Sequence, residues 1–148
     1  MLTPGVDTFA TLPELRARAT DFGATLPAED AACEVLLRRA AEQMAAWPWQ
    51  GWRTLAGQPL CWPRADVPGV APDAVPLAVK QAQCALAVEL HRDDLDPPEQ
   101  RRGPVVRERV DVLDVEYADV RPASSRPRAS LVLASPYLAP VTVQAVRA

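Results

Sequence analysis

The sequence predicts a mainly α domain with about three main helices, a β-hairpin and an extended C-terminal arm. Three segments before residue 92 repeat apolar residues at three- and four-residue intervals, the period of a helix that packs on one side. Residues 105–117 instead alternate partly between apolar and charged side chains, as a half-buried hairpin does. The 16 prolines among 148 residues lie largely outside these segments and favour stiff loops.

Length and composition indicate one small domain. We expect a core with the hairpin over residues 1–117, followed by a linker and docking arm over 118–148. The net charge of −3 argues against a protein whose main task is to grip nucleic-acid phosphates. No stretch approaches the roughly 18–20 continuous apolar residues of a membrane span, so we expect no membrane partner. Three scattered cysteines are typical of buried thiols in a reducing cytosol: Cys33, Cys61 and Cys84.

Two helices are expected first, over residues 11–23 and 27–47. Thr11 and Glu14 have the spacing of a capping box, and Gly23 stands where a left-handed residue can end a helix. Pro27 suits the first turn of the second helix. The apolar stripe expected on the first helix consists of Leu12, Leu15, Ala19 and Phe22.

All four tryptophans lie in a segment, residues 47–72, that is too rich in proline and glycine to be regular. A disordered linker would not leave such large indole surfaces in water. We therefore expect an ordered loop that its own side chains pin to the helices. The residues expected to build this loop are Trp49, Trp52, Trp62, Pro63 and Arg64.

A third helix is expected to begin after Asp73 as its N-cap and to run to about His91. Its apolar residues extend well beyond the roughly 100° stripe of a surface helix. Such a helix is either central to the fold or covered on its second side by another subunit. The candidates for a subunit interface are Leu77, Cys84 and Val88.

The hairpin at 105–117 has a predicted register. A central turn sets Arg109 opposite Asp114 and Arg107 opposite Glu116, which pairs opposite charges across the strands. The two arginines are candidates to line a channel that carries DNA, although the neighbouring carboxylates would largely neutralise them.

The C-terminal arm is expected to contain a linker, a short apolar segment and a tail, over residues 118–128, 130–140 and 141–148. The apolar segment has room for one or two helical turns before Pro136, and the tail can pair as a strand. Behind a Pro- and Arg-rich linker, such a segment can reach another chain by strand addition or groove insertion.

No residue set for catalysis, metal binding or cofactor binding stands out. His91 is typical of a surface histidine at a helix end. The nearby acidic residues lack the glycine and terminal glutamate of a calcium loop: Asp93, Asp94 and Asp96. Glycine-rich phosphate loops and a nucleophile elbow are missing from the sequence. We therefore expect a protein that is not an enzyme and has no cofactor.

The tryptophans also allow a nucleic-acid interpretation. Trp49, Trp52 and Trp62 are interleaved with Arg53 and Arg64, and aromatic rings stack bases of single-stranded DNA at about 1–3 kcal/mol per base. The alternative is that each indole packs into the core. The acidic balance favours packing, because unspecific strand binding normally needs a continuous positive groove.

Four features follow one another along the chain: Trp49 with Gly51, the block Gln-Pro-Leu-Cys-Trp-Pro-Arg at 58–64, Val75-Pro76 before an Ala-rich helix, and Val115-Glu116-Tyr117. In the order and spacing of these features, residues 11–117 resemble the small head–tail connector (adaptor) proteins of tailed bacteriophages, a family often labelled DnaT-like. The resemblance implies a small helical bundle with a protruding hairpin. It further implies a cyclic homo-oligomer, commonly a dodecamer, beneath the portal vertex, where it extends the DNA channel.

The resemblance also implies the partners. In this family the C-terminal segments tend to reach the portal protein, and the candidates for that contact are Leu131, Leu133, Tyr137, Leu138, Val141, Val143 and Val146. The other partners would be a stopper or tail-completion protein and the packaged double-stranded DNA, which passes without sequence-specific binding. We therefore expect a structural virion protein of the neck, assembled in the host cytoplasm. The alternative is a single-stranded DNA-binding accessory protein of phage replication.

Overall fold

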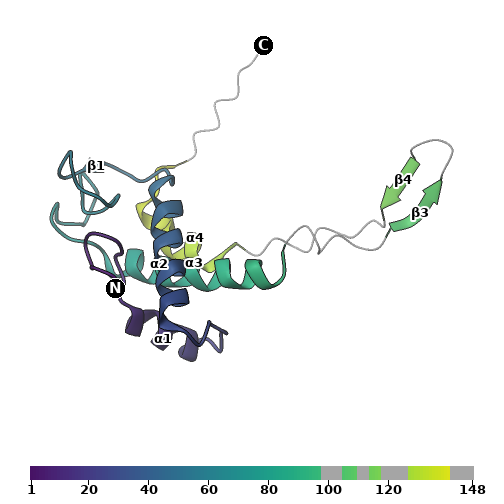
Figure 1. Ribbon diagram of the computed structural model, residues 1–148. Helices are drawn as coiled ribbons and strands as arrows, with labels where there is room; N and C mark the ends of the chain where they lie inside the picture. The colour runs from purple at the N-terminus through teal and green to yellow at the C-terminus, as the bar shows by residue number, and fades with distance from the viewer. Residues whose placement is uncertain (98–104, 110–113, 118–126, 141–148) are drawn as a thin grey trace, which may run out of the picture.

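The computed structural model describes residues 1–97, 105–109, 114–117 and 127–140 (Figure 1). The elements are α1 (Leu12–Asp21), α2 (Asp30–Ala45), β1 (Trp52–Arg53), β2 (Arg64–Ala65), α3 (Leu77–Leu95), β3 (Val105–Arg109), β4 (Asp114–Tyr117), α4 (Ala129–Ala134) and the 3-10 helix η2 (Ser135–Tyr137). The strands form two small antiparallel ribbons, β1 with β2 and β3 with β4. The predicted mainly α fold with a hairpin is therefore confirmed.

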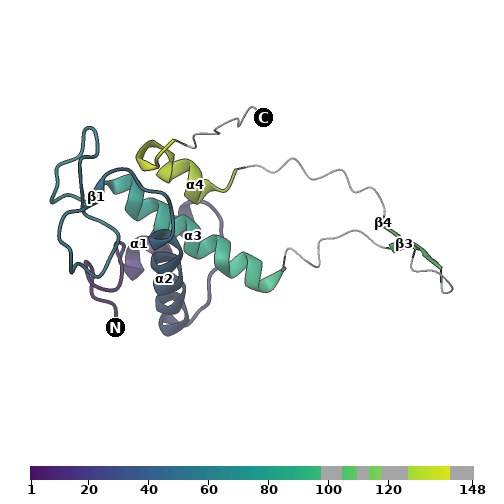
Figure 2. The same cartoon turned by 90° about the horizontal axis from the view of Figure 1, so that it is seen from above.

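Helix α3 lies at the centre of the helical body. Helices α1, α2 and α4 all pack against it. Figure 1 shows α2 crossing α3, and Figure 2 shows α4 on another side of α3. The largest fully buried aliphatic side chains come from three helices and include Leu15, Leu37, Met44, Val79 and Leu86. The unusually apolar third helix is thus covered on several sides by its own chain.

The start of α3 differs from the sequence prediction. The helix begins at Leu77, with Pro76 in the N-cap position and no capping side chain, and it continues to Leu95. Asp73 instead lies in a turn before the helix. A proline disfavours helical angles at the residue before it, so Pro76 prevents a helix from starting earlier.

The side chain of Gln83 joins α3 to two other parts of the chain. Its Oε1 accepts hydrogen bonds from the backbone N–H groups of Phe9 (2.9 Å) and Ala10 (2.8 Å). Its Nε2 donates to the carbonyl of Leu37 in α2 (2.8 Å) and to Oγ1 of Thr8 (2.8 Å). Gln83 is fully buried, so this amide satisfies backbone groups that water cannot reach.

Helix α1 begins as the sequence predicts. The backbone N–H of Thr11 donates to Glu14 Oε2 (2.6 Å), and the N–H of Glu14 donates to Thr11 Oγ1 (3.4 Å), which completes a capping box. The helix ends at Asp21 with Phe22 as C-cap, and Gly23 has the left-handed backbone (φ +63°) that is favoured at the position after the C-cap.

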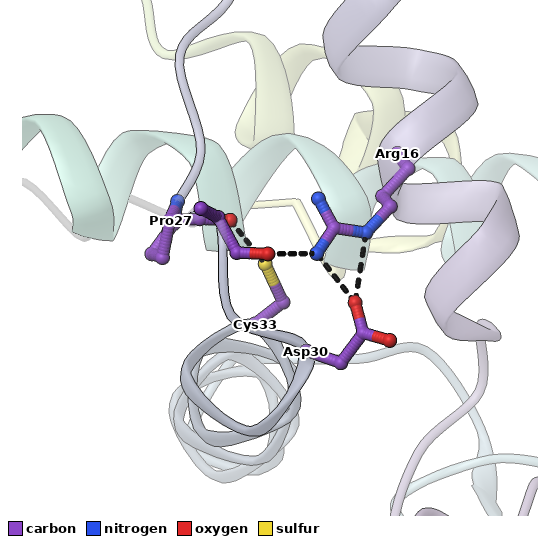
Figure 3. A network of polar contacts seen from close by, with 5 residues as sticks. Arg16, Pro27, Asp30 and Cys33 are labelled. Atoms are coloured by element: carbon purple, nitrogen blue, oxygen red, sulfur yellow. Dashed lines mark hydrogen bonds and ion pairs between the residues drawn. The ribbon is translucent and has the colours of Figure 1, made fainter.

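The connection from α1 to α2 is held by Arg16 (Figure 3). Its guanidinium donates to Asp30 Oδ1 (2.5 Å) and to the carbonyl of Ala28 (3.0 Å). The thiol of Cys33 donates to the carbonyl of Pro27 (3.3 Å). Helix α2 begins at Asp30 with Glu29 as its N-cap. Pro27 therefore lies in the turn before the helix, not in its first turn as expected.

The C-terminal apolar segment packs on the helical body instead of reaching away. The backbone N–H and the hydroxyl of Ser130 in α4 donate to the two oxygens of buried Glu89 in α3 (3.1 and 2.7 Å). Arg128 pairs with Asp93 one turn further along α3 (2.7 Å). Helix α4 therefore packs against α3, while the domain boundary expected at residue 117 stays a prediction.

The hairpin has the predicted register. Arg107 faces Glu116 and Arg109 faces Asp114, with an irregularity between Val105 and Arg107. Both views show the two strands away from the helices (Figures 1 and 2).

Among the residues that the structure describes, no helix combines the length and the apolar character needed to cross a bilayer.

Candidate nucleic-acid interface

Two of the three tryptophans of the nucleic-acid interpretation are core residues, as the packing alternative predicts. Trp49 and Trp62 are 7% and 2% exposed, with ring centroids 5.6 Å apart in an edge-to-face arrangement. Tyr137 continues the cluster, 5.8 Å from Trp62. The indole N–H of Trp49 donates to the carbonyl of Met44 (2.6 Å). Neither ring can stack a base without unfolding the loop.

Trp52 is different, because its side chain is 61% exposed. Strand β1 pairs only with β2, and neither residue of β1 is covered by another layer. The expectation that Trp52 pins the loop is therefore wrong.

Arg64 holds the loop together from within. Its guanidinium donates to the carbonyls of Gln50 (2.7 Å), Gly51 (2.7 Å) and Cys61 (3.2 Å), beside the cis peptide bond that precedes Pro63. Because its donors serve backbone carbonyls, Arg64 adds little to an outward positive surface.

The three residues expected to face a neighbouring subunit lie in different surroundings. Leu77 is 66% exposed, Val88 is half-buried and Cys84 is buried. Burial raises the pKa of the Cys84 thiol to about 12. Cys84 is therefore inaccessible to another subunit, because α1 covers this side of α3. An interface at Leu77 and Val88 stays a prediction.

The portal-docking candidates divide in a similar way. Leu133, Tyr137 and Leu138 pack against the core of their own chain, whereas Leu131 is 40% exposed. Gln50 donates through its side-chain amide to the carbonyl of Leu138 (2.9 Å), which ties this segment to the tryptophan loop. The remaining candidates lie outside the described residues: Val141, Val143 and Val146. For Arg107 and Arg109, the channel-lining candidates, the structure describes only the strand positions that they pair with.

A surface at the end of α1 was not predicted from the sequence. Phe22, expected in the buried stripe, is 71% exposed, and the guanidinium of Arg18 lies over its ring at 4.4 Å from the centroid. The reason is local: Phe22 is the C-cap residue, where the chain leaves the helical path, so it is not buried with Leu15 and Ala19 but lies at the rim of the α1–α3 contact. The i, i+4 spacing of an arginine and an aromatic residue is the signal that could have identified this pair.

Phe22 and Arg18 line two hollows. The α1/α3 hollow has a volume of about 230 Å³, and its lining includes Glu14, Asp21, Leu77 and Lys80. The second hollow, of about 320 Å³, lies between the end of α1, α3 and the start of α4, and we call it the α3/α4 hollow.

The α3/α4 hollow is the positively charged one. Its charged lining residues are Arg18, Arg92, Arg128 and Glu89. The single carboxylate is buried and accepts hydrogen bonds from Ser130 on both oxygens, so it faces the protein. Three guanidinium groups thus line a hollow that adjoins an exposed aromatic ring.

The described residues offer little other chemistry. They contain no cluster of three or more histidine, cysteine or carboxylate side chains that can hold a metal ion. Their three cysteines are buried as free thiols, and burial raises the pKa of Cys61 to about 11.

Comparison with known protein families gives a match over the whole chain. The whole chain, residues 1–148, matches the family described as "Putative DnaT-like ssDNA binding protein", and the chain belongs to this family. No curated protein and no solved structure matched it. The family's description favours the single-strand-binding alternative over the connector ring that the sequence features led us to expect.

Proposed function

We propose that this protein binds single-stranded DNA through its folded surface and carries out no catalysis itself. The observation that carries the proposal is the exposed ring of Phe22 beside a hollow lined by three arginines. Proteins that bind single strands without sequence preference combine aromatic platforms with positive charge that follows the backbone. Membership of a family described by the same activity supports the proposal.

The overall charge of −3 is compatible with this function because the charges are unevenly distributed. Residues 1–97 carry an acidic excess, but the fold gathers Arg18, Arg92 and Arg128 at the α3/α4 hollow. A local positive surface can therefore contact a strand while the remaining surface repels it, which predicts moderate and strongly salt-dependent affinity.

The test is a titration of a fluorescein-labelled oligothymidine of about 20 nucleotides with the full chain, followed by fluorescence anisotropy. We expect saturable binding at about 50 mM salt that weakens by at least tenfold at about 200 mM. The absence of binding at the lower salt concentration would remove the proposed function.

The connector ring is the second candidate, and the position of the hairpin favours it. Strands β3 and β4 lie away from the helices, and the ion pair of Arg128 with Asp93 links the start of α4 to α3. A helical body that presents a separate hairpin suits a ring whose copies each extend one element along a DNA channel. In that role the protein would contact copies of itself, the portal protein, a stopper or tail-completion protein and packaged duplex DNA, in the neck of the virion.

Quantitative peptide counting on purified, DNA-filled particles tests the connector ring, with the portal protein as internal standard. A ratio near one copy per portal subunit supports the ring. Absence from the particles, with abundant protein in infected cells, excludes it.

A further inference from the structure

The ring of Phe22 has one face in use and a largely exposed remainder. The guanidinium of Arg18 lies 4.4 Å from the ring centroid, yet 71% of the residue is exposed. A large aromatic side chain exposed to this extent costs hydration free energy that burial would recover. Arg18 lines both hollows and holds the ring between them.

We infer that Phe22 stacks an unpaired nucleobase and that the α3/α4 hollow binds the adjoining phosphate. This site rests on the proposed single-strand binding and gives that function a location. An aromatic face accepts any base, and an arginine on the opposite face adds a cation–π contribution to the stack.

Charge decides which hollow takes the phosphate. The α1/α3 hollow presents Glu14 and Asp21 with two cations, so its charges balance. The α3/α4 hollow presents three arginines and one carboxylate, on Glu89, whose oxygens accept hydrogen bonds from Ser130, and Arg128 is also paired with Asp93. An excess of positive charge remains there, so a phosphate is attracted to this hollow more than to the balanced α1/α3 hollow.

The arginines of this hollow come from three different elements. Arg18 belongs to α1, Arg92 to the last turns of α3, and Arg128 directly precedes α4. Arg128 is oriented by Asp93 (2.7 Å), which leaves its other guanidinium nitrogen to bind an anion. Convergence of donors from several elements gives a phosphate more than one direction of contact, which a lone surface arginine does not.

The experiment compares variants of the full chain in the oligothymidine titration. We expect F22A and F22L to raise the Kd about five- to hundredfold, because both lose the π face, whereas F22W keeps binding within a few-fold of wild type. R92A is expected to flatten the slope of log Kd against log salt by about 0.7, the value for one lost phosphate contact to a single strand.

Two variants serve as matched controls. W52A removes another exposed aromatic residue, and R38A removes an exposed arginine of α2; neither residue lines the α1/α3 or the α3/α4 hollow. Both are expected to bind like wild type. Thermal unfolding by circular dichroism checks that each variant is folded.

The outcomes separate the site from the function. If wild type binds the oligonucleotide and F22A and F22L bind equally well, the stacking site is wrong while single-strand binding stands. Loss of binding in W52A instead of F22A moves the contact to the tryptophan loop. If a polyglutamate of the same charge displaces the labelled oligothymidine as well as unlabelled oligothymidine does, base stacking is contradicted and an acidic protein partner is indicated. If wild type does not bind, the proposed function fails, and the site with it.

Discussion

Replacing Gln83 by leucine should destabilise the fold strongly without changing its surface. The leucine fills most of the space but cannot bond, so it strands the N–H groups of Phe9 and Ala10, whereas the carbonyl of Leu37 keeps its intrahelical partner within α2. Each buried polar group left without a partner costs about 1–3 kcal/mol. The two together, reduced by the gain from burying an apolar side chain, predict a loss of roughly 2–5 kcal/mol. That is a large part of the roughly 5–15 kcal/mol available to a small domain.

Urea denaturation measures this loss, followed by the fluorescence of the buried tryptophans and by circular dichroism. The midpoint should fall at an unchanged slope, since the same surface is exposed on unfolding. Gln81 lies in the same helix but is exposed, so Q81L is the matched control and should stay within about 0.5 kcal/mol of wild type. A loss below about 1 kcal/mol for Q83L would refute the view that this amide joins the N-terminal segment, α2 and α3.

Three further predictions concern the loop, α4 and the thiols. G51A should lower the free energy of unfolding by roughly 2 kcal/mol or more in urea denaturation, because an added Cβ would lie 1.9 Å from a backbone oxygen of β2. Gly23 has a similar left-handed angle but open space around it, so the control G23A should cost about 1 kcal/mol. S130A should speed amide hydrogen exchange in α4 more than in α2, since it removes a buried bond to α3, and equal rates in both helices would contradict the contact. Because burial raises the pKa values of Cys61 and Cys84 to about 11 and about 12, at most about one thiol in a thousand is ionised at pH 8, and Ellman's reagent should label these residues only after denaturation.

Local patterns in the sequence predicted local structure well. The capping box of Thr11 and Glu14 and the pairing of Arg107 with Glu116 depend on short spacings that the chain displays directly. The start of α3 was misplaced because an acidic N-cap signal at Asp73 competes with the stronger steric effect of Pro76.

Contacts between distant residues could not be predicted in the same way. The bonds from Gln83 to Phe9 and from Glu89 to Ser130 join residues 74 and 41 positions apart. A polar residue inside an apolar helix indicates that a partner exists but does not identify it. For the same reason α4 was expected to leave the body that it completes.

The candidate site was predicted only in part. Aromatic residues interleaved with arginines pointed to the tryptophan loop, but burial of Trp49 and Trp62 leaves only Trp52 exposed there. The exposed Phe22 was hidden within a helical stripe, because periodicity assigns a face only up to the last helical residue. The arginines around it come from elements that only the fold brings together.

Competition between single-stranded and duplex DNA tests the central claim most directly. The complex of the full chain with labelled oligothymidine is titrated with unlabelled single strand or with a duplex of equal length, at about 50 mM salt. Stacking needs an unpaired base, so the single strand should displace the label at a concentration at least about tenfold lower than the duplex. Equal displacement by the two would contradict single-strand recognition and favour contact with the backbone of packaged duplex DNA.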